Sequence, residues 1–188
     1  GATSTVYLRI TIGGARTEFS LNRQCDSEKW IPDQLKSKEE LGIPMNETLI
    51  ILQGAGINVD RGAEEAVEAM KTIDGILMIV GDGDVLNQLK ETVATLQLQK
   101  KVLFYGKKPY SIMMQYTHYA DIGLTLDKPS NLNYQLSLPN KVFDYMAAAR
   151  PTILAIDGVI RDVMEKSQGG LFVPPGDEEE LVSAIRNL

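Results

Sequence analysis

Apolar and polar side chains alternate near the start of the chain. Two segments, residues 6–12 and 15–21, place an apolar side chain at about every second position, and Gly13-Gly14 separates them. A period of two is typical of a half-buried strand. Paired glycines favour a tight turn because they adopt positive φ angles at little cost. The pattern therefore predicts a β-hairpin.

The pattern is less regular between the hairpin and residue 48. Residues 23–31 have no clear period, so we expect an irregular segment there. Residues 36–41 have the polar, helical spacing of a short exposed helix, which Gly42 ends. We therefore place a domain boundary between a hairpin appendage, residues 1–35, and a main domain, residues 36–188.

From residue 48 onward, short apolar runs alternate with stretches of helical periodicity. Such runs are typical of strands buried on both faces of a parallel sheet. The predicted strands lie at 49–52, 76–80, 102–104, 122–124, 152–156 and 171–173. The predicted helices lie at 63–70, 85–96, 111–119, 141–149, 159–165 and 178–188. Right-handed crossovers between these strands predict an α/β fold with a doubly wound, six-stranded parallel sheet.

Ligands of such sheets bind at the carboxyl ends of the strands, so the loops there carry the candidate chemistry. In the first loop, Gly54 and Gly56 let a ligand come close to the backbone. Arg61 precedes a predicted helix, and its guanidinium could hold two oxygens of a diphosphate. A dinucleotide fingerprint is excluded because its third glycine would fall on Val59. The alternative interpretation is a plain strand-to-helix turn.

A second loop, Gly81-Asp82-Gly83-Asp84, contains an Asp-x-Asp pattern that could hold a divalent metal. The structural interpretation is favoured: the glycines form the turn and Asp84 begins a helix. We therefore expect no metal site.

The third candidate is a loop rich in amides and hydroxyls that leads into the helix predicted at 141–149. Lys141 lies at the start of this helix, where the macrodipole disfavours a cation, and a bound anion would explain its position. Asp144 follows at i+3 and could accept hydrogen bonds from a ribose diol. Alternatively, Lys141 and Asp144 form an ordinary surface pair.

Composition limits the alternatives. The chain has 188 residues with 44% hydrophobic and 23% charged side chains, the balance of a globular domain. A single cysteine, Cys25, excludes an internal disulfide, and a single histidine, His118, argues against a zinc site built on histidines. No apolar run reaches the roughly 20 residues of a membrane span. Without a recognisable signal peptide, we expect a cytoplasmic protein.

The net charge of −6 argues against nucleic-acid binding by the whole chain. Residues 1–36 contain five basic and four acidic residues, a net +1, so the remainder carries −7. The charge therefore also changes near the proposed domain boundary.

Seven short motifs follow one another along the main domain: Gly54 to Gly62, Ile79 to Gly83, Val102 to Gly106, Tyr119 to Leu124, Leu138 to Ala147, Arg150 to Ile153 and Gly170 to Asp177. Together they resemble the C-terminal, donor-binding domain of a GT-B retaining glycosyltransferase of family four. The resemblance implies one Rossmann-like half of a GT-B fold. It also implies hexosyl transfer from a UDP- or GDP-linked sugar, without a metal cofactor.

The resemblance also implies roles for individual residues. Arg61 and Lys141 would contact the leaving diphosphate, together with the backbone amides near Gly54 and Gly56. The base would lie near Gly106 and Lys107. Asp144 would bind the ribose, and Asn133 and Asn140 would contact the sugar. Two positions depart from the family pattern. Leu136 replaces the first glutamate of a Glu-x7-Glu motif, and Ala55 replaces a usual arginine, which puts the sugar contacts and the donor type in question.

The first segment resembles a different family. Residues 6–10, 16–20 and 26–30 are similar to the arm-type DNA-binding start of Bacteroidetes tyrosine recombinases. The chain therefore resembles a fusion or a truncated gene in which the acceptor domain of a GT-B enzyme is missing. The resemblance leads us to expect little activity from the chain by itself, and peripheral membrane association for a full enzyme.

Three function classes remain open. The first is the nucleotide-sugar donor domain. The second is a DNA-binding module in which Arg9, Arg16 and Arg23 contact phosphates, although a charge of +1 makes stable binding by the hairpin unexpected. The third is half of a nucleotide-sugar epimerase, which shares the GT-B architecture.

Overall fold

The computed structural model describes residues 3–12, 15–26, 36–130 and 138–188. The chain divides into two compact units, residues 1–43 and 44–188. The prediction that a separate domain begins at residue 36 remains a prediction. In the described ranges, we find no helix with both the length and the apolar character needed to cross a bilayer.

The first unit contains the expected hairpin. Strands β1 (Thr3–Ile12) and β2 (Ala15–Asp26) pair antiparallel, and Ile12 lies opposite Ala15 across a two-residue connection. Strand β2 continues to Asp26, which lies opposite Thr3. The prediction that residues 23–26 are irregular is therefore wrong, because pairing with the start of β1 extends the strand without any alternation of side chains.

Helix α1 (Lys38–Leu41) follows, two residues later than the helical spacing suggested. Its start is set by a capping box: the Ser37 hydroxyl accepts a hydrogen bond from the Glu40 amide, and the Glu40 carboxylate accepts one from the Ser37 amide. The helix ends at Gly42, which has the left-handed φ of 67°.

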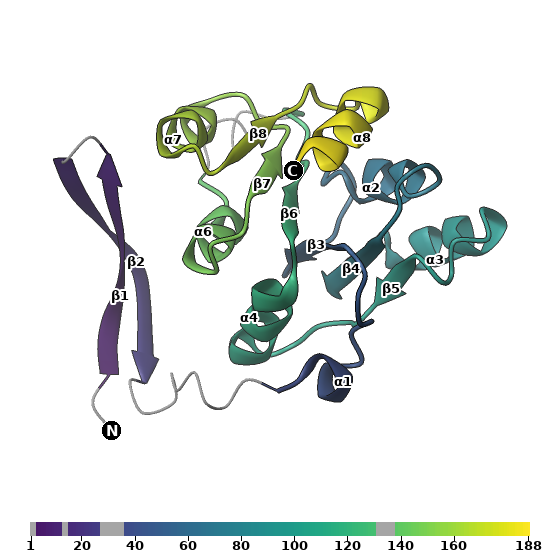
Figure 1. The fold of residues 1–188 in the computed structure, drawn as a ribbon, viewed down its shortest axis with the longest axis horizontal. Coiled ribbons are helices and arrows are strands. Elements are labelled where there is room, and N and C mark those ends of the chain that lie inside the picture. Colours follow the sequence, from purple (N-terminus) through teal and green to yellow (C-terminus); the bar gives the residue numbers. More distant parts are fainter. Residues whose placement is uncertain (1–2, 13–14, 27–35, 131–137) are drawn as a thin grey trace. The chain divides into compact units, whose positions relative to one another are not determined.

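The second unit is built on the predicted parallel sheet. Its strands are β3 (Leu49–Gly54), β4 (Ile76–Gly81), β5 (Val102–Phe104), β6 (Ile122–Thr125), β7 (Thr152–Leu154) and β8 (Gly170–Phe172). They lie in the order β5-β4-β3-β6-β7-β8, and all neighbouring pairs are parallel (Figure 1). The strand order reverses between β3 and β6, so the topological switch point lies between these two strands.

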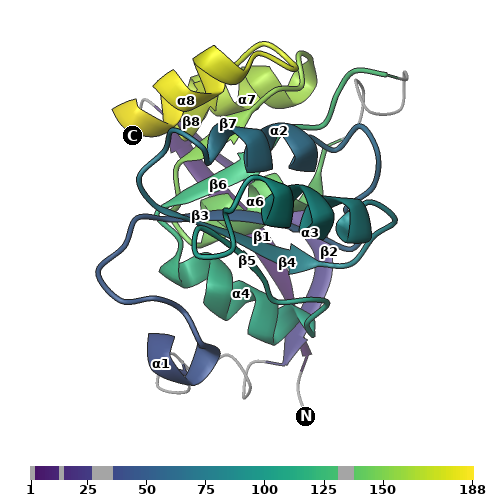
Figure 2. The same cartoon turned by 90° about the vertical axis from the view of Figure 1, so that its right-hand side faces the viewer.

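Helices cover both faces of this sheet, as the doubly wound prediction requires (Figures 1 and 2). The helices are α2 (Ala63–Ala69), α3 (Leu86–Thr95), α4 (Tyr110–Tyr119), α6 (Asn140–Ala147), α7 (Val159–Ser167) and α8 (Glu178–Asn187). Helix α2 packs between α3 and α8 over one face, and α4 and α6 pack together over the other. Separate apolar clusters fill the two layers, and α7 contributes to the one beneath α6.

The start of α2 lies directly against the chain that leaves β6. Gly62 has a φ of +74°, and a Cβ atom placed there would lie 2.2 Å from the Leu126 Cβ and 2.5 Å from its carbonyl oxygen. Next to this contact, the Asp60 carbonyl accepts a hydrogen bond of 2.8 Å from the Lys128 amide. The loop after β3 and the segment after β6 are therefore held together across the switch point.

We expect Gly62→Ala to destabilise the second unit more than Gly176→Ala does. Both glycines have positive φ, which costs an alanine about 1–2 kcal/mol, but a methyl group at Gly176 would meet nothing within 4 Å. The Gly62 variant must also displace backbone at Leu126, a further cost of about 1–3 kcal/mol. Urea unfolding followed by circular dichroism measures the difference. Equal losses for the two variants would show that the contact is not tight.

Candidate functional site

Three charged side chains meet at the carboxyl ends of β3 and β6. Arg61 precedes α2, Asp127 lies two residues after β6, and Lys141 lies in the first turn of α6. The Arg61 Nη1 atom lies 2.8 Å from Asp127 Oδ1, and the Lys141 Nζ atom lies 2.9 Å from Asp127 Oδ2. One carboxylate therefore binds both cations that the sequence suggested for a diphosphate, one on each of its oxygens.

The backbone around this cluster explains why the side chains converge. Gly62 packs on Leu126, so Arg61 comes to lie beside Asp127. The Lys128 ammonium forms an ion pair with Glu65 on α2, at 2.5 Å. The Asp127 carboxylate therefore pairs with Arg61 and Lys141 instead of with Lys128. Because α6 covers the same face as α4, its first turn brings Lys141 to the end of β6.

The three side chains differ in burial in a way that matters for ligand binding. Asp127 is 1% exposed and Lys141 is 13% exposed, whereas the Arg61 side chain is 31% exposed. With one carboxylate and two cations, the cluster carries a net charge of +1. The positive charge is thus directed toward the accessible side, and the negative charge is enclosed.

Burial and charge act in opposite directions on Asp127. Burial raises the pKa of its carboxyl group, but the Lys141 ammonium and the Arg61 guanidinium lower it more, so the net shift is below the ordinary value of 3.8. Burial lowers the pKa of the Lys141 ammonium, and Asp127 opposes this shift without cancelling it. Lys141 therefore depends on Asp127 for part of its tendency to remain protonated.

Asp144 has different partners from those that its spacing suggested. The Tyr110 hydroxyl donates to its Oδ1 at 2.8 Å, and the Gln53 amide nitrogen lies 3.4 Å from its Oδ2. Gln53 in turn accepts a hydrogen bond of 2.5 Å from the Thr117 hydroxyl. Asp144 is only 6% exposed, so it is a buried, hydrogen-bonded carboxylate. The ion pair of Lys141 is with Asp127 rather than with Asp144, which disagrees with the alternative of a simple surface pair.

Comparison with known proteins identifies the second unit. Residues 49–188 match the family model described as glycosyl transferases group 1, which covers more than half of the chain. The chain belongs to this family. Residues 2–53 match a second model, described as an arm DNA-binding domain. Both resemblances noted in the sequence are thereby confirmed.

The chain is also similar to individual group 1 relatives and to solved structures. It is 27% identical over 149 residues to the amylovoran biosynthesis glycosyltransferase AmsK of Erwinia amylovora, a match that covers 77% of this chain and 37% of AmsK. A glycosyltransferase of Rickettsia africae superposes with a TM-score of 0.68 at 22% identity, covering 84% of this chain and 41% of that one.

Anabaena HepE, solved in complex with UDP and glucose, superposes with a TM-score of 0.68 at 17% identity, covering 80% of this chain and 40% of HepE. At these identities the structural likenesses show the fold, which is one Rossmann-like half of a GT-B glycosyltransferase. The chain spans about two fifths of the length of these relatives.

The other predicted site residues that the structure describes are dispersed along the same edge. Gly54 pairs with Gly81, and the Gly81 amide donates to the Gly106 carbonyl at 3.1 Å, so the ends of β3, β4 and β5 lie side by side. Lys107 and Asn140 are exposed next to this edge. Gly56 lies in the loop after β3. Asn133 and Leu136 lie outside the described residues.

The Gly81-Asp82-Gly83-Asp84 loop supports its neighbour. The Ile57 amide donates to the Asp82 carbonyl at 2.8 Å, and a Cβ atom at Gly83 would lie 2.0 Å from the Ile57 carbonyl oxygen. Helix α3 begins at Leu86, so the expectation that Asp84 begins it is wrong by two residues. In the described ranges, no three His, Cys, Asp or Glu side chains gather as metal ligands would.

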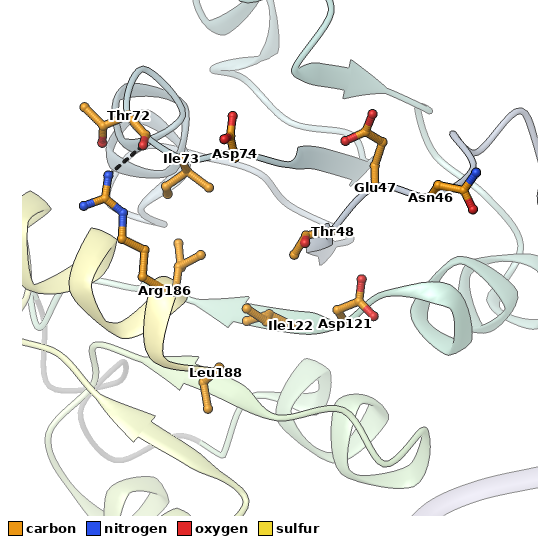
Figure 3. A pocket seen from close by; sticks show the side chains of 11 residues that line it. Asn46, Glu47, Thr48, Thr72, Ile73, Asp74, Asp121, Ile122, Arg186 and Leu188 are labelled. Carbon is orange, nitrogen blue, oxygen red and sulfur yellow. Dashed lines mark hydrogen bonds between the residues drawn. The ribbon is translucent and has the colours of Figure 1, made fainter.

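A pocket lies at the opposite end of the sheet (Figure 3). It has a volume of about 640 Å³, and its lining includes Thr48 and Asp121, which precede β3 and β6. The Arg186 guanidinium reaches the Thr72 carbonyl at its rim, at 2.8 Å. None of the predicted site residues lines this pocket. The candidate site is thus an open edge of the group 1 fold rather than this cavity.

The structure adds Asp127, Tyr110 and Gln53 to the candidate site. Asp127 lies directly after a buried strand at the switch point, and this position in the sequence is a usable signal for a site residue. Gln53 gives a similar signal, since it is a polar residue directly after the apolar run at 49–52. The partnership of Tyr110 with Asp144 depends on the packing of α4 against α6, which no local pattern reveals.

We expect Asp127→Asn to destabilise the protein near pH 7 and to have little effect in acid. The pKa of Asp127 is lowered by folding, so its ionised form stabilises the fold above the ordinary value of 3.8, and this stabilisation is lost as the pH falls through the folded-state pKa. Unfolding free energies of both proteins, measured from pH 7 to pH 2.5, should converge at the acid end. A difference that does not change with pH would contradict this, and Asp74→Asn, at an exposed carboxylate, is the control.

Proposed function

We propose that residues 44–188 are the nucleotide-sugar donor-binding domain of a retaining glycosyltransferase that moves a hexosyl group. The observation that carries this proposal is the convergence of Arg61 and Lys141 on Asp127 at the switch point. Membership of the glycosyl transferases group 1 family supports it independently. The same membership favours glycosyl transfer over epimerisation.

The proposed chemistry is electrostatic. When the sugar leaves its donor, negative charge accumulates on the departing nucleoside diphosphate. Fixed cations in a partly buried site stabilise such charge because they need no reorganisation during the reaction. Arg61 can present two donors to adjacent phosphate oxygens, and Lys141 supplies a compact charge at the start of α6, where the helix dipole also favours an anion.

Other residues along the edge would bind the rest of a UDP- or GDP-linked donor. The Asp144 carboxylate would accept hydrogen bonds from the ribose hydroxyls, either together with the one from the Tyr110 hydroxyl or instead of it. We assign the base to the region of Gly106 and Lys107, and the sugar to Asn133 and Asn140. HepE, which shares the fold, was solved with UDP and glucose, and this supports a UDP-linked donor here. We propose no metal cofactor.

We further propose that the 188 residues bind the donor but transfer little or no sugar by themselves. The open edge carries charges for the donor, and a second surface would have to supply the acceptor. Peripheral membrane association of such a two-part enzyme remains part of this proposal.

We expect Lys141→Met to weaken UDP binding by at least about tenfold. Loss of a hydrogen bond between charged groups costs about 1.5–3 kcal/mol, and about 1.4 kcal/mol corresponds to a factor of ten. Isothermal titration calorimetry with UDP, UDP-glucose and GDP measures the affinities. Lys100→Met, at an exposed position before β5, removes the same charge far from the site and should leave binding unchanged.

Two results would contradict the proposed function. One is the absence of binding of any of these nucleotides at millimolar concentration by the unmodified chain. The other is equal weakening by Lys141→Met and Lys100→Met, since that would show a general effect of charge instead of a site.

The match to an arm DNA-binding domain supports a second function for the first unit. We propose that the β1–β2 hairpin contacts DNA phosphates through Arg9, Arg16 and Arg23. Each phosphate contact contributes about −0.9 to the slope of log K against log salt concentration. Replacing these three arginines with glutamine should therefore make the slope less negative by about 3. Fluorescence anisotropy with a labelled duplex measures this slope.

A matched control removes three charges from the second unit instead, by replacing Lys90, Lys100 and Lys166 with glutamine. If both triple variants change the slope equally, the hairpin is not the DNA-binding element.

A further inference from the structure

Asp127 lies between the two cations to which the proposed function assigns the diphosphate. Its oxygens contact different partners, Oδ1 with Arg61 at 2.8 Å and Oδ2 with Lys141 at 2.9 Å. Because a carboxylate is planar and rigid, it sets the spacing of the two cations as well as their charge balance. We propose that Asp127 is a positioning residue that holds Arg61 and Lys141 side by side as a charged pair for one diphosphate group. This inference rests on the proposed function.

A purely stabilising role explains the arrangement less well. Apolar side chains of similar volume often stabilise a fold as well as a buried ion pair does, because the cost of desolvation offsets the Coulomb attraction, although removing one partner of such a pair is destabilising. The carboxylate is 1% exposed, so it cannot itself meet a ligand. Its effect on an incoming anion must therefore pass through the two cations, of which Arg61 is the more exposed.

Removing the carboxylate would act mainly on Lys141. The Arg61 guanidinium keeps its proton at any ordinary pH. Lys141 is largely buried, and both burial and the nearby Arg61 charge lower the pKa of its ammonium group, whereas Asp127 raises it. With a neutral residue at position 127, Lys141 would lose its proton at a lower pH, and the site would lose half of its cationic charge.

Other ionisable groups around the cluster do not replace Asp127. Asp144 and Tyr145, on the same helix as Lys141, are both buried, and the Asp144 carboxylate is bound by Tyr110. Burial raises the pKa of the Tyr145 hydroxyl, so that it stays neutral. On the side of α2 and β6, the Lys128 ammonium is held by Glu65.

The test compares how UDP affinity depends on pH in the unmodified chain and in Asp127→Asn. Binding that requires a protonated Lys141 weakens about tenfold per pH unit above the pKa of that group. We expect this decline to begin at a lower pH in Asp127→Asn than in the unmodified chain. Ionisation of UDP itself is common to both proteins. In the double variant Asp127→Asn, Lys141→Arg, UDP affinity should no longer decline at the lower pH, because arginine stays charged.

A second measurement does not depend on the ligand. Titration of the Lys141 Nζ resonance by NMR should give a lower pKa in Asp127→Asn than in the unmodified chain. Parallel pH profiles in calorimetry, or an unchanged Lys141 titration, would overturn the positioning role. If the unmodified chain binds no UDP at any pH while the Lys141 resonance shifts as expected, the proposed function fails, and the coupling of Asp127 to Lys141 stands.

Discussion

The buried carboxylate of Asp127 is the interaction on which the candidate site depends. It brings together a guanidinium from the loop after β3 and an ammonium from α6, two segments far apart in the sequence. Two like charges at such close quarters repel each other, and one of them is largely buried. A single carboxylate removes the repulsion and still leaves a net positive charge. The site can therefore exist in the folded chain before any anion arrives.

The sheet topology makes this meeting possible. Because the strand order reverses between β3 and β6, the chains leaving these two strands diverge to opposite faces and leave room at the edge between them. Gly62 permits the approach, since any side chain there would collide with Leu126. The hydrogen bond from the Lys128 amide to the Asp60 carbonyl then fixes how the segment after β6 is aligned with the loop after β3. Site geometry thus follows from fold geometry, with a glycine as the decisive residue.

The fold can be predicted from the sequence because the signals for its strands and helices are local. Apolar runs such as 49–52 and 76–80 show burial on both faces, and Asp177, a residue type that favours the N-cap position, caps α8. Arg61 and Lys141 were also recognisable, since a cation at the start of a helix is locally unfavourable. Their pairings were not: Asp127 joins Arg61 to Lys141, and Tyr110 binds Asp144, through packing between elements. Residues 23–26 likewise form a strand because of pairing with β1 rather than because of their own pattern.

The open edge and the pocket differ in how they could bind a ligand. A pocket binds by surrounding its ligand with surface, and the one near Thr48 and Asp121 has that shape but no converging cations among its described lining except Arg186, which is bonded to Thr72. An anion is bound by a few fixed charges, which an open edge can supply. Arg61, at 31% exposure, presents charge outward, while Asp127 holds it from beneath. Under the proposed function, this surface holds the donor and leaves its other side open for a second substrate, as transfer between two substrates demands.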